Sequence, residues 1–245
     1  MNISPSRPPA PRKAVLPLAA AALALTAALP GGLAAATPAR ADQATPAIVD
    51  STRHTGQYLS LTFDDGPHPV NTPKLLAVLE KHHVKATFCL WGDHVKQYPE
   101  IVRQIADAGH LLCNHTMHHD DMGAWTPEAI RADLEETSAV IREAVPDAKI
   151  DYFRAPYGSW GQTPTVAAAM GMQPLGWATV VGDWEPPGTA ELVRRLREGI
   201  RPGGVVLLHD GGGDRSQTVE AVDQIIPELK SEGWRFDKPA RRGDG

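Results

Sequence analysis

The chain has 245 residues and a formal net charge of −5 at neutral pH, which is enough sequence for one large domain. An acidic chain is a poor partner for nucleic acid or anionic membranes, whereas the binding of an uncharged polysaccharide does not depend on the net charge of the protein. The two cysteines, Cys89 and Cys113, lie in apolar stretches. The sequence leaves open whether they form a disulfide or remain two buried thiols.

The first 41 residues have the order of a secretory signal peptide. Basic residues at positions 7, 12 and 13 precede an apolar run over 14–29, and small residues lead to Ala41, after which we expect cleavage. An uncleaved membrane anchor is the alternative, which the short apolar core, broken by Pro17, disfavours. Cleavage would remove four basic residues and change the formal charge from −5 to −9. We therefore expect an extracellular protein whose mature chain is not inserted in a membrane.

The polar segment 42–56 is interpreted as a linker, and strands then alternate with helices over a single domain, 57–238, before a frayed tail over 239–245. Helices are expected to begin at the Thr-Pro pairs Thr72, Thr126 and Thr163, at Thr189, near Pro99 and near Ser216. The expected strands are 58–63, 86–91, 110–114, 152–155, 173–181 and 204–209, with a short one at 234–236.

Such alternation predicts parallel strands joined by right-handed crossovers, either in an open doubly wound sheet or in a barrel. In both architectures the loops after the strands build the functional site. Groups suited to chemistry lie at the C-terminal ends of five of the expected strands: Asp64–Asp65, His115, Arg154, Asp183 and His209. We therefore expect these side chains to meet at one end of the sheet.

The first strand ends on two adjacent carboxylates, Asp64 and Asp65, followed by Gly66–Pro67. Adjacent side chains of a regular strand point to opposite faces, so both can serve one site only where the backbone bends. The Gly-Pro pair predicts that bend. The alternative is a pair of aspartates that caps a surface turn.

His115 and His119 are four residues apart, so on a helical turn they would share a face and could hold one metal ion, with His118 as a competing ligand. Two histidines and a carboxylate from Asp64 or Asp65 would form a site typical of zinc or a similar divalent cation. A chance pair of surface histidines is the alternative.

Five segments resemble the ordered motifs of the polysaccharide deacetylase family, the NodB-homology domain of carbohydrate esterase family 4. They are Thr62–Pro67, Asn114–His119, Arg154–Gly158, Gly182–Trp184 and Leu207–His209, and the resemblance covers about 57–236. It implies an α/β fold, a distorted (β/α) barrel of parallel strands in a single catalytic domain, with a metal ion in a surface groove. It also implies a hydrolase that removes acetyl groups from polysaccharides or oligosaccharides.

The resemblance further implies a role for each motif residue. Asp65, His115 and His119 would bind a divalent metal ion, Zn²⁺ or alternatively Co²⁺. Asp64 would be the general base held by Arg154, and His209 the general acid oriented by Asp183. The groove would be completed by the backbone N–H of Tyr157 at the oxyanion and by Tyr157, Trp184 and Leu207 at the sugar and acetyl group.

Two departures from the family pattern stand out. Val180 occupies a position that usually carries an aspartate, which removes a supporting contact expected to reach Arg154. Met117 and His118 replace an aromatic and a hydroxyl residue that are frequent in the family, so the groove wall near the metal differs.

The sequence predicts a secreted, monomeric, metal-dependent deacetylase that hydrolyses N-acetyl groups of an amino-sugar glycan such as chitin, chitooligosaccharide or peptidoglycan. An acetylxylan esterase that uses the same site is the first alternative. A carbohydrate-binding protein without turnover is the second, and Val180 is its only motivation.

Overall fold

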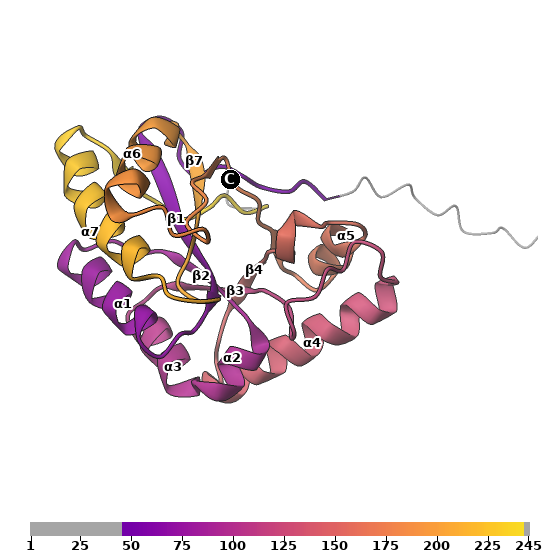
Figure 1. Ribbon diagram of the computed structural model, residues 1–245. Coiled ribbons are helices and arrows are strands. Elements are labelled where there is room, and N and C mark those ends of the chain that lie inside the picture. The colour runs from indigo at the N-terminus through magenta and orange to yellow at the C-terminus, as the bar shows by residue number, and fades with distance from the viewer. Residues whose placement is uncertain (1–45, 243–245) are drawn as a thin grey trace, which may run out of the picture. The chain divides into compact units, whose positions relative to one another are not determined.

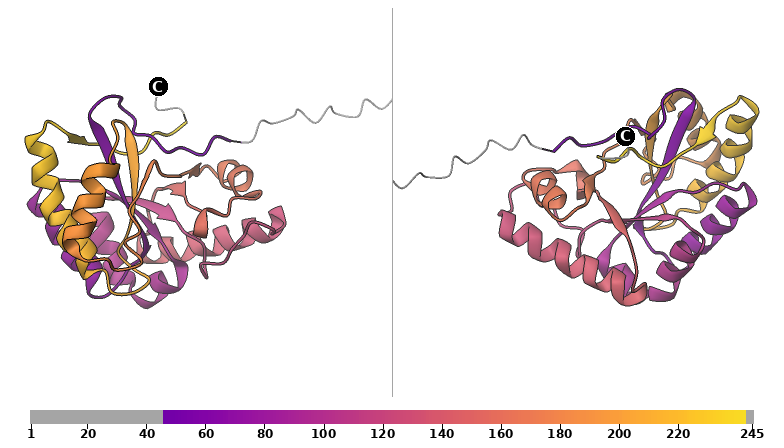
Figure 2. Two further views of the ribbon diagram at one scale, coloured as in Figure 1. Left: turned by 45° about the horizontal axis from the view of Figure 1, so that its top comes forward. Right: turned by 180° about the vertical axis from the view of Figure 1, so that it is seen from behind.

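The computed structural model describes residues 46–242, so the predicted signal peptide lies outside the described residues. Its centre is one curled sheet in which every pairing between strands is parallel. The helices lie on the outer side of the curl (Figure 1, Figure 2). This arrangement confirms the expected distorted (β/α) barrel.

The sheet order is β5, β4, β3, β2, β1, β7, β6, with β8 beside β1. The strands are β1 (Tyr58–Gly66), β2 (Thr87–Leu90), β3 (Leu111–Asn114), β4 (Ile150–Phe153), β5 (Gln173–Pro174), β6 (Thr179–Val180), β7 (Gly204–His209) and β8 (Arg235–Phe236). The helices are α1 (Asn71–Lys81), α2 (Gly92–Gln97), α3 (Pro99–Asp107), α4 (Pro127–Ala144), α5 (Thr163–Ala169), α6 (Thr189–Gly199) and α7 (Ser216–Ser231). A single 3₁₀ turn covers Pro156–Gly158.

The two faces of β1 explain why its sequence is largely apolar and yet ends in acidic residues that could take part in catalysis. Leu59, Leu61 and Phe63 are buried in the main hydrophobic core. Thr62 and Asp64 alternate with them and face the inside of the curl, because successive side chains of a strand point to opposite faces. The inner face therefore carries the polar groups and the outer face anchors the helices.

The inside of the curl also contains the two cysteines. Cys89 on β2 and Cys113 on β3 are directly opposite each other in the strand register, with Cα atoms 4.2 Å apart, and they form a disulfide. Both side chains are fully buried, beside Tyr152, Leu175 and Val205. Of the two states that the sequence left open, the structure has the disulfide.

The predicted strand 173–181 is wrong in part, because the structure breaks it into β5 and β6 at opposite edges of the sheet. The carbonyl oxygens of Leu175 and Gly176 accept hydrogen bonds from the buried Arg154 guanidinium over 3.0 and 2.9 Å. These two oxygens point toward the buried Arg154 side chain, and the next strand along the chain, β6, pairs with β7 at the other edge of the sheet. The sheet is consequently open between β5 and β6.

The helix starts were predicted with mixed success. Thr126 caps α4 by accepting a hydrogen bond from the Ala129 N–H. Thr72 was expected to cap α1, but the helix begins one residue earlier and the Thr72 hydroxyl accepts from the His68 N–H instead. The short helix α2, ahead of Pro99, was not predicted.

Backbone near both ends of the described residues lies against the open edge of the sheet. The Val49 N–H donates to the Pro174 carbonyl, and the Thr52 N–H donates to the Gly203 carbonyl. The Ala240 N–H donates to the Ser51 carbonyl. These segments had been interpreted as parts of a linker and of a frayed tail. They instead satisfy polar backbone groups that an open edge would leave unpaired.

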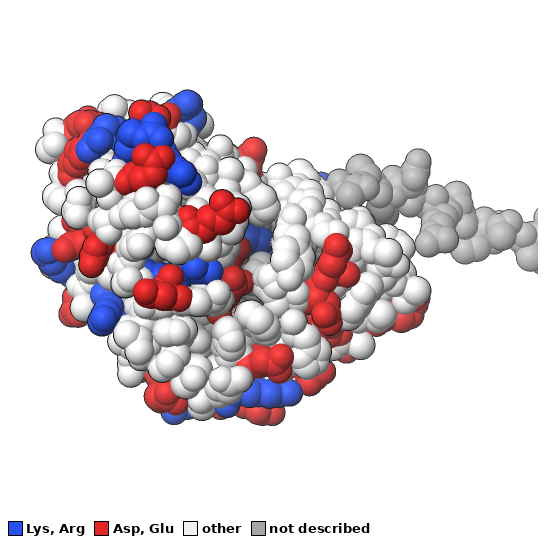
Figure 3. Space-filling model, in the orientation of Figure 1, with Lys and Arg blue, Asp and Glu red and all other residues white. Residues whose placement is uncertain are grey.

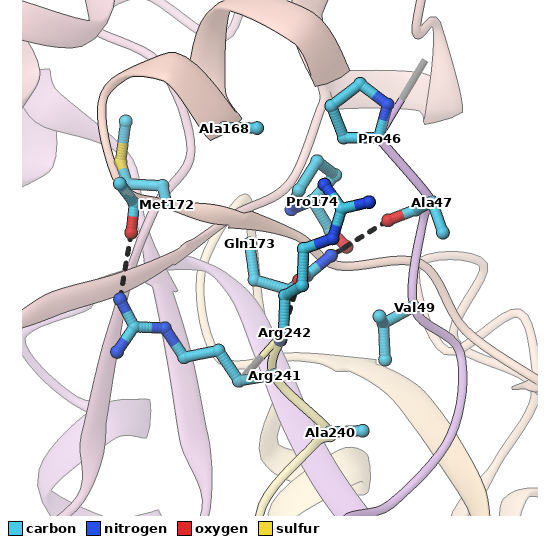
Figure 4. Close-up of a pocket in the computed structure, with 11 residues that line it drawn as sticks. Pro46, Ala47, Val49, Ala168, Met172, Gln173, Pro174, Ala240, Arg241 and Arg242 are labelled. Atoms are coloured by element: carbon cyan, nitrogen blue, oxygen red, sulfur yellow. Dashed lines mark hydrogen bonds between the residues drawn. The ribbon is translucent and has the colours of Figure 1, made fainter. Parts of the chain in front are cut away.

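Between these terminal segments and the chain before β5 lies a cavity of about 490 Å³ (Figure 4). The Gln173 side chain donates to the Ala47 carbonyl and accepts from the Arg242 N–H, and Arg241 donates to the Gly171 carbonyl. Among the described residues that line this cavity, none is an aspartate, glutamate or histidine.

The charged surface is mixed on the face that Figure 3 shows. On α6, Arg194 pairs with Glu191 and Arg197 pairs with Glu228 of α7. Paired charges of this kind do not form the continuous basic field that nucleic acid binding requires. Within residues 46–242, none of the helices combines the length and the apolar character needed to cross a membrane.

Candidate active site

The ends of β1 and β3 bring three potential metal ligands together. Asp65, His115 and His119 each offer one ligand atom, and these atoms lie within 4.8 Å of one another. The Asp65 Oδ1 atom is 3.4 Å from His115 Nε2 and 3.2 Å from His119 Nε2. The structure thus assembles the carboxylate and the two histidines that the sequence predicted as one cluster.

A bulge at the end of β1 brings Asp65 to the same side as Asp64. The register with β2 shifts between Asp64 and Gly66, and Asp65 has a φ of 68°. A regular strand would point Asp65 toward the outer helices. The predicted bend therefore exists, and it is centred on Asp65 itself.

The loop after β7 packs directly on this bulge. A Cβ atom on Gly211 would lie 1.9 Å from the Asp65 carbonyl oxygen, so only glycine allows the two segments to approach this closely. Gly211 thereby supports the position of Asp65. The Asp65 carbonyl oxygen is also held by His94 Nδ1, at 2.7 Å.

The prediction that residues 115–119 form a helical turn is wrong. The segment is an irregular loop in which Thr116 and His119 have φ values of 68° and 58°. Asn114 accepts a hydrogen bond from the Thr116 N–H, and Asp133 of α4 accepts one from the Met117 N–H. These side chains shape the loop so that both histidines still converge.

His118 lies outside the cluster. Its imidazole is exposed and its Nδ1 atom is 2.9 Å from the Asp93 carboxylate. Of the two histidines that competed as the second ligand, the structure brings His119 to Asp65.

Both clustered histidines are oriented through their Nδ1 atoms. His115 Nδ1 is 2.8 Å from the Arg154 carbonyl oxygen, and His119 Nδ1 is 3.1 Å from the Tyr157 hydroxyl. A carbonyl can only accept, so His115 carries a proton on Nδ1, and its Nε2 atom is the one that faces the cluster. Such a hydrogen bond on the second nitrogen is typical of metal-bound histidine.

The Asp65 carboxylate fits a cation at this place. Its Oδ1 atom is buried and makes no hydrogen bond, although two imidazole nitrogens lie close to it. Burial alone would raise the pKa of Asp65, but His115 and His119 outweigh burial and hold that pKa well below its usual range. A buried anionic oxygen that faces two nitrogen ligands is a donor set suited to zinc or a similar cation.

Asp64 is buried beside this cluster and forms an ion pair with Arg154. The Arg154 Nη1 atom donates to Asp64 Oδ1 over 2.7 Å and to the Thr62 hydroxyl over 2.8 Å. The other Asp64 oxygen is 3.8 Å from His115 Nε2. One oxygen of Asp64 is therefore fixed by the guanidinium, and the other faces the metal ligands.

The absence of an aspartate at position 180 does not affect Arg154 in the expected way. Val180 is 49% exposed at the edge of the sheet, whereas Arg154 is fully buried. The Arg154 guanidinium donates to Thr62, Asp64 and the carbonyls of Leu175 and Gly176. It is held in place without a carboxylate from β6.

His209, at the end of β7, is held by Asp183. Its Nδ1 atom lies 2.8 Å from Asp183 Oδ1, and its backbone N–H donates to Asp183 Oδ2 over 2.8 Å. Burial would lower the pKa of His209, but the Asp183 carboxylate, aided by Asp64 and Asp65, raises it above the ordinary value. The imidazole is thus favoured in its protonated state.

Two exposed aromatic rings flank these groups. Tyr157 is 73% exposed and its ring centroid is 4.7 Å from that of His119. Trp184 is 45% exposed and lies edge-on to His209, with centroids 5.5 Å apart. Leu207 is buried on β7, where it pairs with Thr62 and Val180.

The sequence reasoning missed three residues at this site: Trp91, His94 and Asp210. The Trp91 ring lies between those of His94 and His119, with centroid distances of 4.3 and 5.0 Å. Trp91 ends the predicted strand 86–91, so the rule that strand ends build the site could have included it. Asp210 is fully buried next to His209, and burial raises its pKa to about 7.

Known proteins resemble this chain in sequence. The model of the polysaccharide deacetylase family matches residues 51–175. A chitooligosaccharide deacetylase of Rhizobium leguminosarum bv. trifolii is 41% identical over 187 residues, which cover 71% of this chain and 86% of the relative. A peptidoglycan-N-acetylglucosamine deacetylase of Bacillus cereus is 36% identical over 181 residues, which cover 73% of this chain and 84% of the relative.

Solved structures also resemble it. A peptidoglycan N-acetylglucosamine deacetylase matches with a TM-score of 0.72 and 32% identity, covering 76% of this chain and 88% of the other. A family 4 pseudoenzyme of Bacillus anthracis matches with a TM-score of 0.73 and 30% identity, covering 79% and 67%.

The distorted (β/α) barrel, with carboxylates and histidines gathered at the ends of its strands, is the architecture of a hydrolase that could use a metal ion. The sequence matches identify it further, because they extend over most of the folded domain: the chain belongs to the polysaccharide deacetylase family.

Proposed function

We propose that this protein is a secreted, zinc-dependent enzyme that hydrolyses N-acetyl groups of amino-sugar glycans, with chitooligosaccharide or peptidoglycan as its substrate. The proposal depends on one observation above all. The Asp65, His115 and His119 cluster lies beside a carboxylate held by arginine, and a histidine held by a carboxylate is close enough to interact with Asp64 and Asp65. The relatives named for chitooligosaccharide and peptidoglycan deacetylation support the choice of substrate.

In this proposal Asp65, His115 and His119 hold the cation. A bound Zn²⁺ would supply Lewis-acid polarisation of the acetyl carbonyl and would lower the pKa of an attacking water. The ligand set leaves open positions for substrate and water, as catalytic zinc sites do. The proton donors and acceptors come from the protein.

Asp64 acts as the general base. Its Oδ1 atom is held by Arg154 over 2.7 Å, so the other oxygen is directed to the side of the ligands and accepts the proton of the attacking water. The buried guanidinium keeps the carboxylate in one orientation throughout turnover.

His209 acts as the general acid. Its Nδ1 atom binds Asp183, which leaves Nε2 to donate a proton to the leaving amine nitrogen when the carbon–nitrogen bond breaks. The backbone N–H of Tyr157 is proposed to donate to the developing oxyanion. Leu207 would contact the acetyl methyl group, and the Trp184 and Tyr157 rings would contact the sugar.

Similarity of fold alone does not establish turnover, because a matching structure is a pseudoenzyme. A mutant of that pseudoenzyme is described as having restored enzymatic activity, so activity in this fold depends on individual residues. In the present chain each proposed ligand, base and acid position carries a residue able to perform its role. We therefore favour an active enzyme over a binding protein.

Hydrolysis of acetyl esters on xylan is a second candidate. The family 4 domain of a multidomain xylanase matches with a TM-score of 0.66 and 33% identity, covering 74% of this chain and 86% of the other. The same water activation would cleave an ester, whose leaving oxygen needs less help from His209 than an amine does.

Acetate release decides between these functions. The chain from Asp42 onward is loaded with Zn²⁺ or Co²⁺ and incubated with chitooligosaccharide, peptidoglycan and acetylxylan. We expect acetate from the amino-sugar substrates, and release from acetylxylan alone would exclude the amidase. Mass spectrometry of the exported protein tests secretion, with an N-terminus at Asp42 as the expected result. Sedimentation equilibrium tests the expected monomer.

A further inference from the structure

Asp183 is more than a partner of His209. It is a buried carboxylate that accepts three hydrogen bonds, two from His209 and a third from a helix on the outer side of the sheet. The third donor is the Thr218 hydroxyl, 2.9 Å from Asp183 Oδ2. The same oxygen accepts the His209 N–H, so Thr218 and His209 share it.

Thr218 is well placed to fix this carboxylate. It lies in the first turn of α7 and is only 1% exposed, so water cannot replace its hydroxyl without entering the core. The N-terminal end of a helix also favours a nearby negative charge. Asp183 thus receives its support from α7 as well as from β7.

The N-terminal part of α7 holds the segment after Asp183 at two more points. The Gln217 side chain accepts a hydrogen bond from the Gly188 N–H over 2.7 Å. Glu220 accepts one from the Thr189 hydroxyl over 2.7 Å. Both contacts belong to the chain that leads from Trp184 into α6. The start of α7 therefore contacts this segment at Asp183 and again where it enters α6.

We propose that Thr218 is a positioning residue for proton donation by His209, acting through Asp183. Without its hydroxyl, one oxygen of a buried carboxylate loses a donor and Asp183 is free to rotate away from the imidazole. The His209 ring would then no longer be held with Nε2 toward the leaving group.

The other charged groups around His209 do not depend on this contact. Asp64 and Asp65 face the imidazole from β1, and Asp210 follows it in the loop after β7. Asp64 is fixed by Arg154, and Asp65 by the bulge of β1. Loss of the Thr218 hydroxyl should therefore disturb the proton donor and leave the base and the metal ligands in place.

The test compares Thr218→Val, which keeps the shape and removes the hydroxyl, with Thr218→Ser, which keeps the hydroxyl. Thr87→Val is the matched control, because Thr87 is equally buried at the start of β2 and its hydroxyl has no hydrogen-bond partner. Thr218→Ala replaces the valine variant if that protein does not fold. All variants are studied as metal-loaded protein, with metal content measured.

The kinetic readout rests on the proposed function and uses the leaving group. With chitooligosaccharide, whose amine must be protonated, Thr218→Val should lower kcat by about 10-fold or more at unchanged KM, since acid–base catalysis contributes about 100-fold or more. With 4-nitrophenyl acetate, whose leaving group needs no proton, the same variant should match wild type. Thr218→Ser should restore the amide activity. Equal loss on both substrates, or no loss on either, would overturn the proposal.

A second readout does not require turnover, so it separates this inference from the proposed function. The Nδ1–H proton of His209, identified by its disappearance in His209→Gln, should shift upfield and exchange faster with water in Thr218→Val. It should stay in place in Thr218→Ser and Thr87→Val. An unchanged resonance in Thr218→Val refutes the role of Thr218, whereas wild-type protein that releases no acetate refutes only the proposed function.

Discussion

The Arg154 guanidinium donates to Asp64 Oδ1 over 2.7 Å at a place where both side chains are almost completely excluded from solvent. Such a pair is costly to bury, because both ions lose their hydration. Here the cost is offset by the further hydrogen bonds of Arg154 to Thr62, Leu175 and Gly176. This arrangement holds the Asp64 carboxylate, which we propose as the general base, in a fixed orientation.

Replacing Arg154 should therefore affect both stability and turnover. Arg154→Met leaves the Asp64 charge buried without a partner, which typically costs about 3–5 kcal/mol. We expect a loss of this size in the free energy of unfolding, measured by urea denaturation, together with a large loss of kcat. Arg154→Lys keeps the charge but not the fork of donors, and should recover only part of both. Wild-type stability in Arg154→Met would mean that the ion pair between Asp64 and Arg154 does not stabilise the fold.

Asp64→Asn separates the base from the metal ligands. The amide oxygen can still accept from Arg154, so the variant should fold and retain stoichiometric metal. It cannot accept a proton from water, and kcat should fall by about 100-fold or more. Metal content by mass spectrometry and acetate release by a coupled assay are measured on the same sample. Loss of the metal would instead place Asp64 among the ligands.

The cluster predicts which histidine matters for metal binding. His115→Ala and Asp65→Ala should abolish stoichiometric binding of Zn²⁺, measured by competition with a chelator, because each removes one of three ligands. His118→Ala is the matched control, since its imidazole lies at Asp93. It should bind metal as wild type does. Weakened binding in His118→Ala with full binding in His119→Ala would reverse the assignment.

Much of this site could be predicted because it follows from strand ends. Once β1, β3, β4 and β7 are recognised as parallel, residues such as Asp64, His115, Arg154 and His209 must come close together. The sequence could not reveal how the ligands converge. Asp65 reaches the cluster through a bulge and His119 through a loop with positive φ values, both of which depend on contacts with distant segments, such as Gly211 and Asp133.

Activity should depend on pH through His209. Its pKa is raised above the ordinary value because Asp183 outweighs the effect of burial, and a general acid must be protonated. We expect kcat/KM to fall as the pH rises through that pKa. Asp183→Asn removes the negative charge, so the pKa of His209 should decrease and the fall should begin at lower pH. Initial rates between about pH 5 and 9 test this, and an alkaline limb that stays in place would show that another group supplies the proton.

The gap between β5 and β6 could not be predicted from local sequence patterns, because these contain no information on contacts between distant residues. The apolar stretch 173–181 has the composition of one strand, yet the Arg154 guanidinium binds the carbonyls of Leu175 and Gly176 within it and the sheet ends there. Segment 49–52 then occupies the open edge, although its composition resembles a linker. Both outcomes depend on groups more than 20 residues away in the sequence, which a periodicity analysis does not include.

The Cys89–Cys113 disulfide should contribute to stability without contributing to chemistry. It closes a segment of 24 residues between two strands whose ends carry Trp91 and His115, and such a closure is typically worth about 3 kcal/mol through the unfolded state. The double variant Cys89→Ala, Cys113→Ala should therefore unfold at a clearly lower temperature, while its kcat/KM below that temperature stays close to wild type. Calorimetry with and without a reducing agent measures the effect, and reducing agent should lower the melting temperature of wild type but not of the double variant. A melting temperature of wild type that is insensitive to complete reduction would mean that the bond is absent or contributes nothing in solution.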